Sequence, residues 1–96
     1  MTLILRPAAA ADVEEAFRWY EARRDGLGDE FLEVVQSGLY SIGSHPQASP
    51  VVHRDIRRHL LPRFPYALFY RLIEGESVVI GCFHAKRHPR LWGSRR

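Results

Sequence analysis

The residues that could do chemistry in this sequence are mostly basic, and they gather in its second half. After residue 50 the chain has nine arginines and one lysine but only three acidic residues. Arginine binds phosphate through paired hydrogen bonds, and a histidine or lysine can exchange a proton with a ribose 2′-hydroxyl. The basic candidates and their aromatic neighbours are Arg57, Arg58, Arg63, Arg71, His84, Lys86, Arg87, His88, Arg90, Tyr66, Tyr70 and Trp92.

Two interpretations of this basic group are open. If Arg58, Arg71, His84 and Lys86 converge on neighbouring strands, they supply what a small metal-free ribonuclease needs. Alternatively, the arginines are the solvated face of an antiparallel sheet, with their stems lying over apolar neighbours. We expect the basic end of the sheet to face a large anionic target.

Other kinds of chemistry find no support in the sequence. The five histidines lack the spacing of metal ligands, and Gly26 and Gly28 lack the lysine of a phosphate-binding loop. The single cysteine, Cys82, excludes an internal disulfide and fits a reducing compartment. The sequence therefore predicts no metal and no cofactor.

Length and composition indicate one globular domain. A chain of 96 residues has room for one core, and 46% apolar residues is ordinary for a folded protein. The start does not have the pattern of a signal peptide, and the apolar runs are too short to cross a membrane. We expect a single domain over residues 1–96, soluble and cytoplasmic.

The sequence of the N-terminal half predicts the elements that would support the basic second half of the chain. Residues 3–6 favour a short strand, and Pro7 starts a helix with an apolar stripe at Val13, Ala16, Phe17 and Tyr20. A glycine-containing turn precedes a second amphipathic helix over residues 29–44, so the two helices form an antiparallel hairpin. Trp19 lies off the stripe, where it either packs on the second helix or is open to a partner.

The C-terminal half predicts three strands, over residues 56–61, 66–73 and 77–85. Both faces of the last strand are apolar, which indicates a central strand, with Val78, Ile80 and Cys82 on one face and Val79, Phe83 and Ala85 on the other. Trp92 either covers the edge of the core or anchors a partner. The predicted fold class is α+β in the order β-α-α-β-β-β, a helical hairpin packed on a small twisted, mainly antiparallel sheet.

Several segments together resemble a known family. The opening Arg6-Pro7-Ala8 with Trp19-Tyr20-Glu21, and Leu27-Gly28-Asp29-Glu30-Phe31, resemble the two helices of ParE toxins of the RelE/ParE superfamily. His45-Pro46, Arg57-Arg58, Arg63-Phe64-Pro65-Tyr66 and His84…Trp92 complete the pattern in the same order. The resemblance covers nearly the whole chain and agrees with the predicted order of elements.

The resemblance implies the toxin of a type II toxin–antitoxin module, often described as plasmid stabilisation. It implies either a non-enzymatic poison of DNA gyrase, as in ParE toxins, or a ribosome-dependent mRNA endonuclease, as in RelE toxins. Lys86 is the only lysine, so the lysine-rich set of the nucleases is missing. A third alternative is a non-toxic module that binds only its antitoxin.

The implied partners are a cognate, ParD-like antitoxin and either gyrase or the ribosome with its mRNA, and no membrane. A hetero-oligomer with the antitoxin is possible on this interpretation. The expected target-binding residues are Arg57, Arg58, Arg63, Lys86, Arg87, Arg90 and Trp92. The expected antitoxin contacts are Trp19, Tyr20, Leu27, Phe31 and Val35.

Overall fold

The computed structural model describes residues 2–87 and 89–96. The elements follow the order β-α-α-β-β-β-β with a short C-terminal helix. Their bounds are β1 Leu3–Leu5, α1 Pro7–Arg23, α2 Leu27–Ser44, β2 Val51–His53, β3 Ile56–Leu60, β4 Tyr66–Ile73, β5 Glu76–His84 and α3 Pro89–Gly93.

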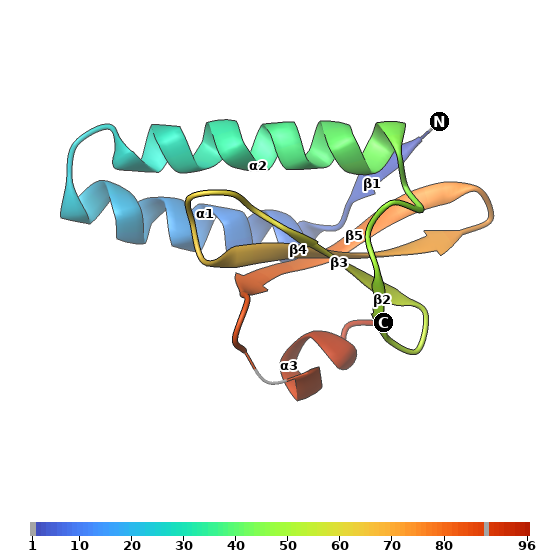
Figure 1. Cartoon of the computed structure of the whole chain (residues 1–96). Coiled ribbons are helices and arrows are strands. Elements are labelled where there is room, and N and C mark those ends of the chain that lie inside the picture. Colours follow the sequence, from blue (N-terminus) through green and yellow to red (C-terminus); the bar gives the residue numbers. More distant parts are fainter. Residues whose placement is uncertain (1, 88) are drawn as a thin grey trace.

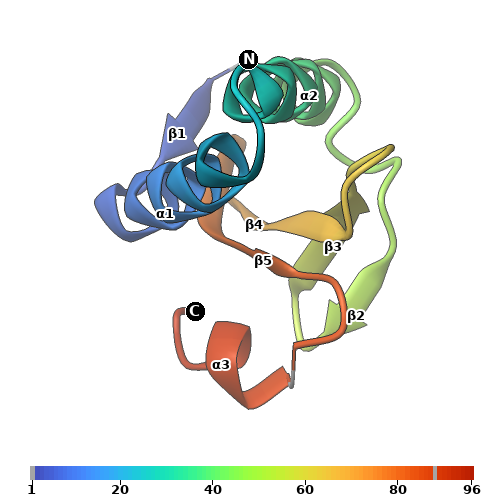
Figure 2. The ribbon, with the colours of Figure 1, turned by 90° about the vertical axis from the view of Figure 1, so that its left-hand side faces the viewer.

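The elements form a layered α+β fold, which confirms the predicted class. The sheet has five strands in the order β1-β5-β4-β3-β2. Only β1 pairs in parallel, with β5, and the other neighbours are antiparallel. The α1–α2 hairpin lies on one side of the sheet and α3 on the other (Figures 1 and 2). Because β5 lies between β1 and β4, the prediction that it is a central strand is confirmed.

The turn between the two helices is stabilised by a residue of the first helix. Gly26 adopts φ 88°, a conformation that favours glycine, and places the start of α2 beside α1. The Glu21 carboxylate accepts hydrogen bonds from the backbone N–H groups of Gly26 (3.0 Å) and Gly28 (2.9 Å). These groups lie at the start of α2, where backbone donors lack helical partners, so Glu21 caps α2 from the neighbouring helix.

Each face of the sheet carries its own apolar cluster. Between the sheet and the helix hairpin lie the predicted stripes of both helices, with buried Val13, Ala16 and Phe31 among them. The second cluster lies on the α3 side. Its buried members are Ile56, Ala67, Phe69, Val78, Ile80 and Trp92.

A β-bulge in β5 overturns the predicted assignment of its faces. Phe69 pairs with Gly81 while the next residue, Tyr70, pairs with Val79, so Ile80 is an extra residue in the strand. As a result Val79 and Cys82 both belong to the cluster under the helices. Strict alternation had put Cys82 with Ile80, but Ile80 packs on the α3 side. It had also put Phe83 and Ala85 with Val79, but both of these residues pack on the α3 side too.

Two short elements were not predicted. The strand β2 pairs with β3 through Val51–Arg57 and His53–Ile56, at the outer edge of the sheet. The helix α3 is only five residues long, so it carries no helical periodicity and is held by tertiary contacts. In the described part of the chain, no helix combines the length and apolar character needed to cross a membrane.

Candidate functional site

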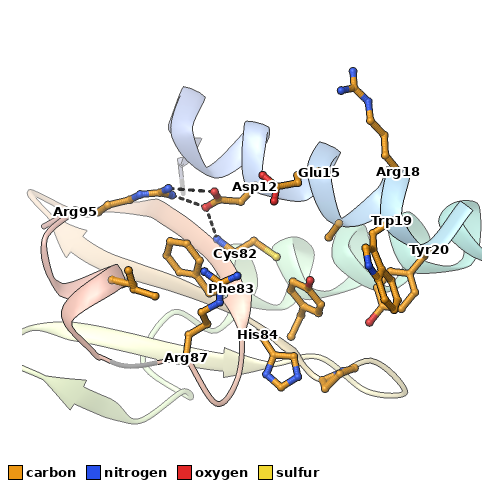
Figure 3. A pocket seen from close by; sticks show the side chains of 14 residues that line it. Asp12, Glu15, Arg18, Trp19, Tyr20, Cys82, Phe83, His84, Arg87 and Arg95 are labelled. Atoms are coloured by element: carbon orange, nitrogen blue, oxygen red, sulfur yellow. Dashed lines mark hydrogen bonds and ion pairs between the residues drawn. The ribbon is translucent and has the colours of Figure 1, made fainter. Parts of the chain in front are cut away.

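A large cleft lies between α1, the end of β5 and the C-terminal segment (Figure 3). Its volume is about 980 Å³. The lining residues come from four parts of the chain. They are Asp12, Glu15, Ala16, Arg18, Trp19, Tyr20, Pro65, Tyr66, Cys82, Phe83, His84, Arg87, Leu91 and Arg95.

The α1 wall of this cleft carries an exposed tryptophan. Asp12, Glu15 and Trp19 are spaced so that they follow one face of the helix. Trp19 keeps 51% of its surface exposed, and the Arg23 guanidinium lies 3.9 Å from the centre of its ring. Its edge-to-face contact with Tyr20, at 5.1 Å between centroids, fixes the indole against the helix. Trp19 is therefore open to solvent, which was one of its two predicted placements.

An ion pair ties the opposite wall to α1. The Arg95 guanidinium donates to both carboxylate oxygens of Asp12, at 3.1 Å to Oδ1. The same carboxylate accepts a hydrogen bond from the Cys82 backbone N–H at 3.0 Å, just beyond the bulge. Arg95 also lies over the Phe83 ring, 4.6 Å from its centre. Asp12 therefore satisfies a backbone group near the bulge and holds the C-terminal segment at the same time.

The titratable groups on the floor of the cleft stay protonated near neutral pH. Burial raises the pKa of the Tyr20 and Tyr66 phenols above their ordinary value. Burial, with a smaller contribution from the Asp12 charge, raises the pKa of the Cys82 thiol to about 12. These groups therefore act as walls and hydrogen-bond donors rather than as bases or nucleophiles.

The residues proposed for ribonuclease chemistry do not come together. Arg58 pairs across the sheet with Phe69, and Arg71 pairs with Val78, so both lie on the α3 side. His84 pairs with Tyr66, whose ring packs on the cluster under the helices.

Arg71 is also committed to structure. Its Nε donates to Asp55 at 3.0 Å and its Nη1 donates to the Arg96 carbonyl at 2.9 Å. Lys86 lies exposed in the turn after β5, where its backbone N–H donates to the His84 Nδ1 at 3.2 Å. Within residues 2–87 and 89–96, no cluster of His, Cys, Asp and Glu could hold a metal ion.

The expected target-binding arginines are distributed over the molecule rather than gathered at one end. Arg57 donates to the carbonyls of Gln47 (3.2 Å) and Ser49 (2.7 Å), and Arg63 donates to Glu30 at 2.6 Å. Arg58 is half-buried, and its Nε has no hydrogen-bond partner among the described residues. The prediction of a single basic end is therefore wrong for these three residues.

The remaining target-binding candidates lie around α3. Arg87 lines the cleft and Arg90 lines a second, smaller hollow. Trp92 is 4% exposed, so the structure places it in the core of the α3 side and not as an open anchor. His88 lies outside the described residues.

The expected antitoxin contacts divide into core and surface. Tyr20, Phe31 and Val35 are buried under the helices, where they hold the hairpin on the sheet. Leu27 is half-buried at the start of α2, and Trp19 is exposed in the cleft. Three residues of this cleft were not predicted from the sequence, because nothing in their local pattern indicates that they meet. They are Asp12, Leu91 and Arg95.

Comparison with known proteins identifies relatives over most of the chain. Residues 3–89 match the sequence model of a family described as the ParE toxin of the type II toxin–antitoxin system parDE. A similar solved structure is that of a chromosomal ParDE toxin–antitoxin system from P. aeruginosa, with a TM-score of 0.66 and 20% identity over 88% of this chain and 95% of that chain. At that identity the likeness concerns the fold. No curated protein matches the chain.

Proposed function

Because this chain belongs to the ParE toxin family of type II toxin–antitoxin systems, we propose that it acts by binding its target, DNA gyrase, and not by cutting RNA. On this proposal the toxin holds the gyrase–DNA complex in its cleaved state. A cognate antitoxin neutralises the toxin by covering the exposed surface that its action requires.

The main observation against a nuclease is that the sheet separates the basic candidate residues. Arg58 and Arg71 lie on the α3 side, while His84 lies on the helix side. Acid–base cleavage needs its proton-transferring groups and its phosphate-binding groups within hydrogen-bond reach of one substrate. Groups separated by a packed sheet do not meet this requirement.

A supercoiling assay tests the proposed target. Purified gyrase converts relaxed plasmid to supercoiled plasmid, and we expect added toxin to reduce this conversion. After detergent and protease treatment, linear plasmid should accumulate in proportion to the toxin. Unchanged supercoiling with no linear product would refute gyrase as the target.

Induction in cells separates the proposal from the nuclease alternative. We expect growth arrest without codon-phased cuts in mRNA 5′-end maps. His84→Gln is the most useful variant, because it keeps an acceptor for Lys86 but cannot carry out imidazole chemistry, and it should still arrest growth. Codon-phased cuts that vanish in His84→Gln would support the nuclease instead. Arg71→Ala is less decisive, since Arg71 also holds Asp55 and Arg96.

The cleft of Figure 3 is the surface that fits the antitoxin best. Trp19 and Leu91 face it with 51% and 45% of their surfaces exposed. Within the described residues the Arg87 side chain has no ion-pair or hydrogen-bond partner. An apolar surface beside an unpaired arginine suits a segment that combines apolar and acidic side chains and folds as it binds.

Two exposed aromatic residues provide a matched test of this placement. Trp19→Ala should weaken antitoxin binding at least about tenfold, as expected for a tryptophan at an interface. Tyr40→Ala is the control, since Tyr40 is 77% exposed on α2 and does not line the cleft. Equal affinities of wild type and Trp19→Ala would place the antitoxin on another surface and leave the gyrase proposal untouched.

A further inference from the structure

A second hollow lies between the β2–β3 turn and the C-terminal segment, and its lining is strongly basic. Its volume is about 520 Å³, and its polar lining comes from His53, Arg54, Arg90, Ser94 and Arg96. His53 of β2 lies beside Trp92 and Gly93 of α3, although the two segments are far apart in the sequence. None of its residues takes part in the cleft of Figure 3.

Few acidic side chains are available to neutralise this hollow. Asp55 is the only acidic residue between positions 34 and 73, and no acidic residue occurs from position 77 to the end. Asp55 is already bound by Arg71 at 2.9 Å and by Arg96 at 2.7 Å. The arginines around the hollow therefore outnumber the carboxylate beside it.

Arg54 stands on one wall of this hollow without an internal partner among the described residues, and packing holds both walls in place. Arg54 follows β2 with φ 52°, in a tight turn that joins β2 to β3. Its guanidinium has no ion pair or hydrogen bond within the described residues, and its side chain is exposed. On the other wall, Trp92 packs edge-to-face on the His53 ring at 5.8 Å and thereby fixes α3 beside the turn.

From this arrangement we propose that the hollow between the β2–β3 turn and α3 is a binding site for the phosphate groups of a DNA backbone. A phosphodiester presents two charged oxygens and further acceptors, which several guanidinium groups and a hydroxyl can bind together. A single carboxylate of a protein partner uses fewer such donors, so the density of arginines favours phosphate. The inference does not depend on gyrase being the target, because it concerns contact between this chain and DNA itself.

The test is binding of a labelled 20-base-pair duplex by fluorescence anisotropy, with no topoisomerase present. Wild type should bind at low salt, and its affinity should fall steeply as salt rises, because phosphate contacts release counterions. Arg54→Gln should weaken binding about three- to tenfold and lower the slope of log affinity against log salt by about one. Arg54→Glu should weaken it further, and neither variant should alter the fold.

Arg18→Gln is the matched control. It removes the same charge from an arginine that is 74% exposed and pairs with Glu14 on α1, and it should change duplex affinity less than about twofold. An equal loss of duplex affinity in Arg18→Gln and Arg54→Gln would mean that the DNA is held by diffuse electrostatic attraction. That result would refute the proposed site. Absence of duplex binding at low salt would overturn it too.

Two other probes distinguish the DNA backbone from an acidic protein and from free phosphate as the bound anion. Polyglutamate that binds as tightly as DNA, with the same loss in Arg54→Gln, would assign the hollow to an acidic protein and refute the DNA proposal. Inorganic phosphate that binds at the hollow while the duplex does not would show a free-phosphate site and refute it equally. Phosphate that competes with the duplex in wild type but not in Arg54→Gln is the expected result.

Discussion

The indole of Trp92 stacks on the phenyl ring of Phe69, with the ring centroids 4.7 Å apart and the planes at 16°. Phe69 lies in β4 on the side of the sheet away from the helix hairpin, and Trp92 is the buried residue of α3. This stack closes an apolar sheet face that the two long helices do not reach. The C-terminal segment is therefore part of the folded core.

The stack predicts a large effect of truncating Trp92. Trp92→Ala should lower the free energy of unfolding by roughly 3 kcal/mol, because it removes a buried aromatic ring and exposes Phe69. Leu91→Ala, one residue away and 45% exposed, should cost less than about 1 kcal/mol. Urea unfolding followed by circular dichroism measures both. Similar small losses in the two variants would show that α3 does not pack on the sheet in solution.

The carboxylate of Asp55 makes the stability of the C-terminal contacts depend on pH. Hydrogen bonds from Arg71 and then Arg96 lower the pKa of Asp55 from 3.8 to about 2. The folded state therefore favours the ionised form, and the resulting stabilisation is present above about pH 4 and is lost as the pH falls from there towards 2. Asp55 is 42% exposed, so solvent screening limits the effect to about 1 kcal/mol or less.

Asp55→Asn tests this linkage. The variant should be less stable than wild type at pH 7, and the difference in the free energy of unfolding should shrink towards zero near pH 2. Glu33→Gln is the control, since Glu33 is exposed and has no ion-pair partner in the described part of the chain. A stability difference for Asp55→Asn that stays constant from pH 7 to pH 2.5 would contradict the ion pair.

The thiol of Cys82 should be inert in the folded protein. Its pKa of about 12, caused by burial and by the nearby Asp12 charge, leaves almost no thiolate at pH 8. An aromatic disulfide reagent should therefore react slowly with native protein and quickly after addition of guanidinium chloride. Rapid labelling of native protein, absent in Cys82→Ser, would mean that the strand opens near its bulge.

Two glycines of α2 should respond in opposite directions to the same substitution. A Cβ at Gly28 would lie 2.7 Å from the Phe17 ring, so Gly28→Ala should destabilise the protein by about 1–3 kcal/mol. A Cβ at Gly43 has nothing within 4 Å, so Gly43→Ala should stabilise it by up to about 1 kcal/mol. Thermal unfolding measures both, and a stabilising Gly28→Ala would show that the helices lie farther apart.

The regular parts of the fold were accessible from the sequence because they depend on local periodicity. Val13, Ala16 and Tyr20 mark the buried face of α1, and the apolar strands β4 and β5 follow from their β-branched and aromatic residues. The bulge was not accessible, since an extra residue such as Ile80 leaves an apolar strand looking uninterrupted. The five-residue α3 is too short to show any period.

The candidate site was only partly predictable for a related reason. The arginines could be identified from the composition. Which of them form internal ion pairs depends on carboxylates that are distant in the sequence. Arg95 meets Asp12 across 83 positions, and Arg71 meets Asp55 across 16. Arg54 was not among the predicted site residues, and only the packing of α3 beside β2 gives it neighbours of the same charge.

The extra residue in β5 also decides on which side of the sheet the chain leaves the strand. Because Ile80 shifts the alternation by one position, Phe83 faces α3 and His84 faces the helices. Removing one residue there would turn over every side chain downstream and would direct the following segment away from Phe69. At the tip of the β4–β5 hairpin, at Gly75, a change in length does not reverse the faces of the strand. Insertions and deletions should therefore be tolerated far better at this tip than in the middle of β5.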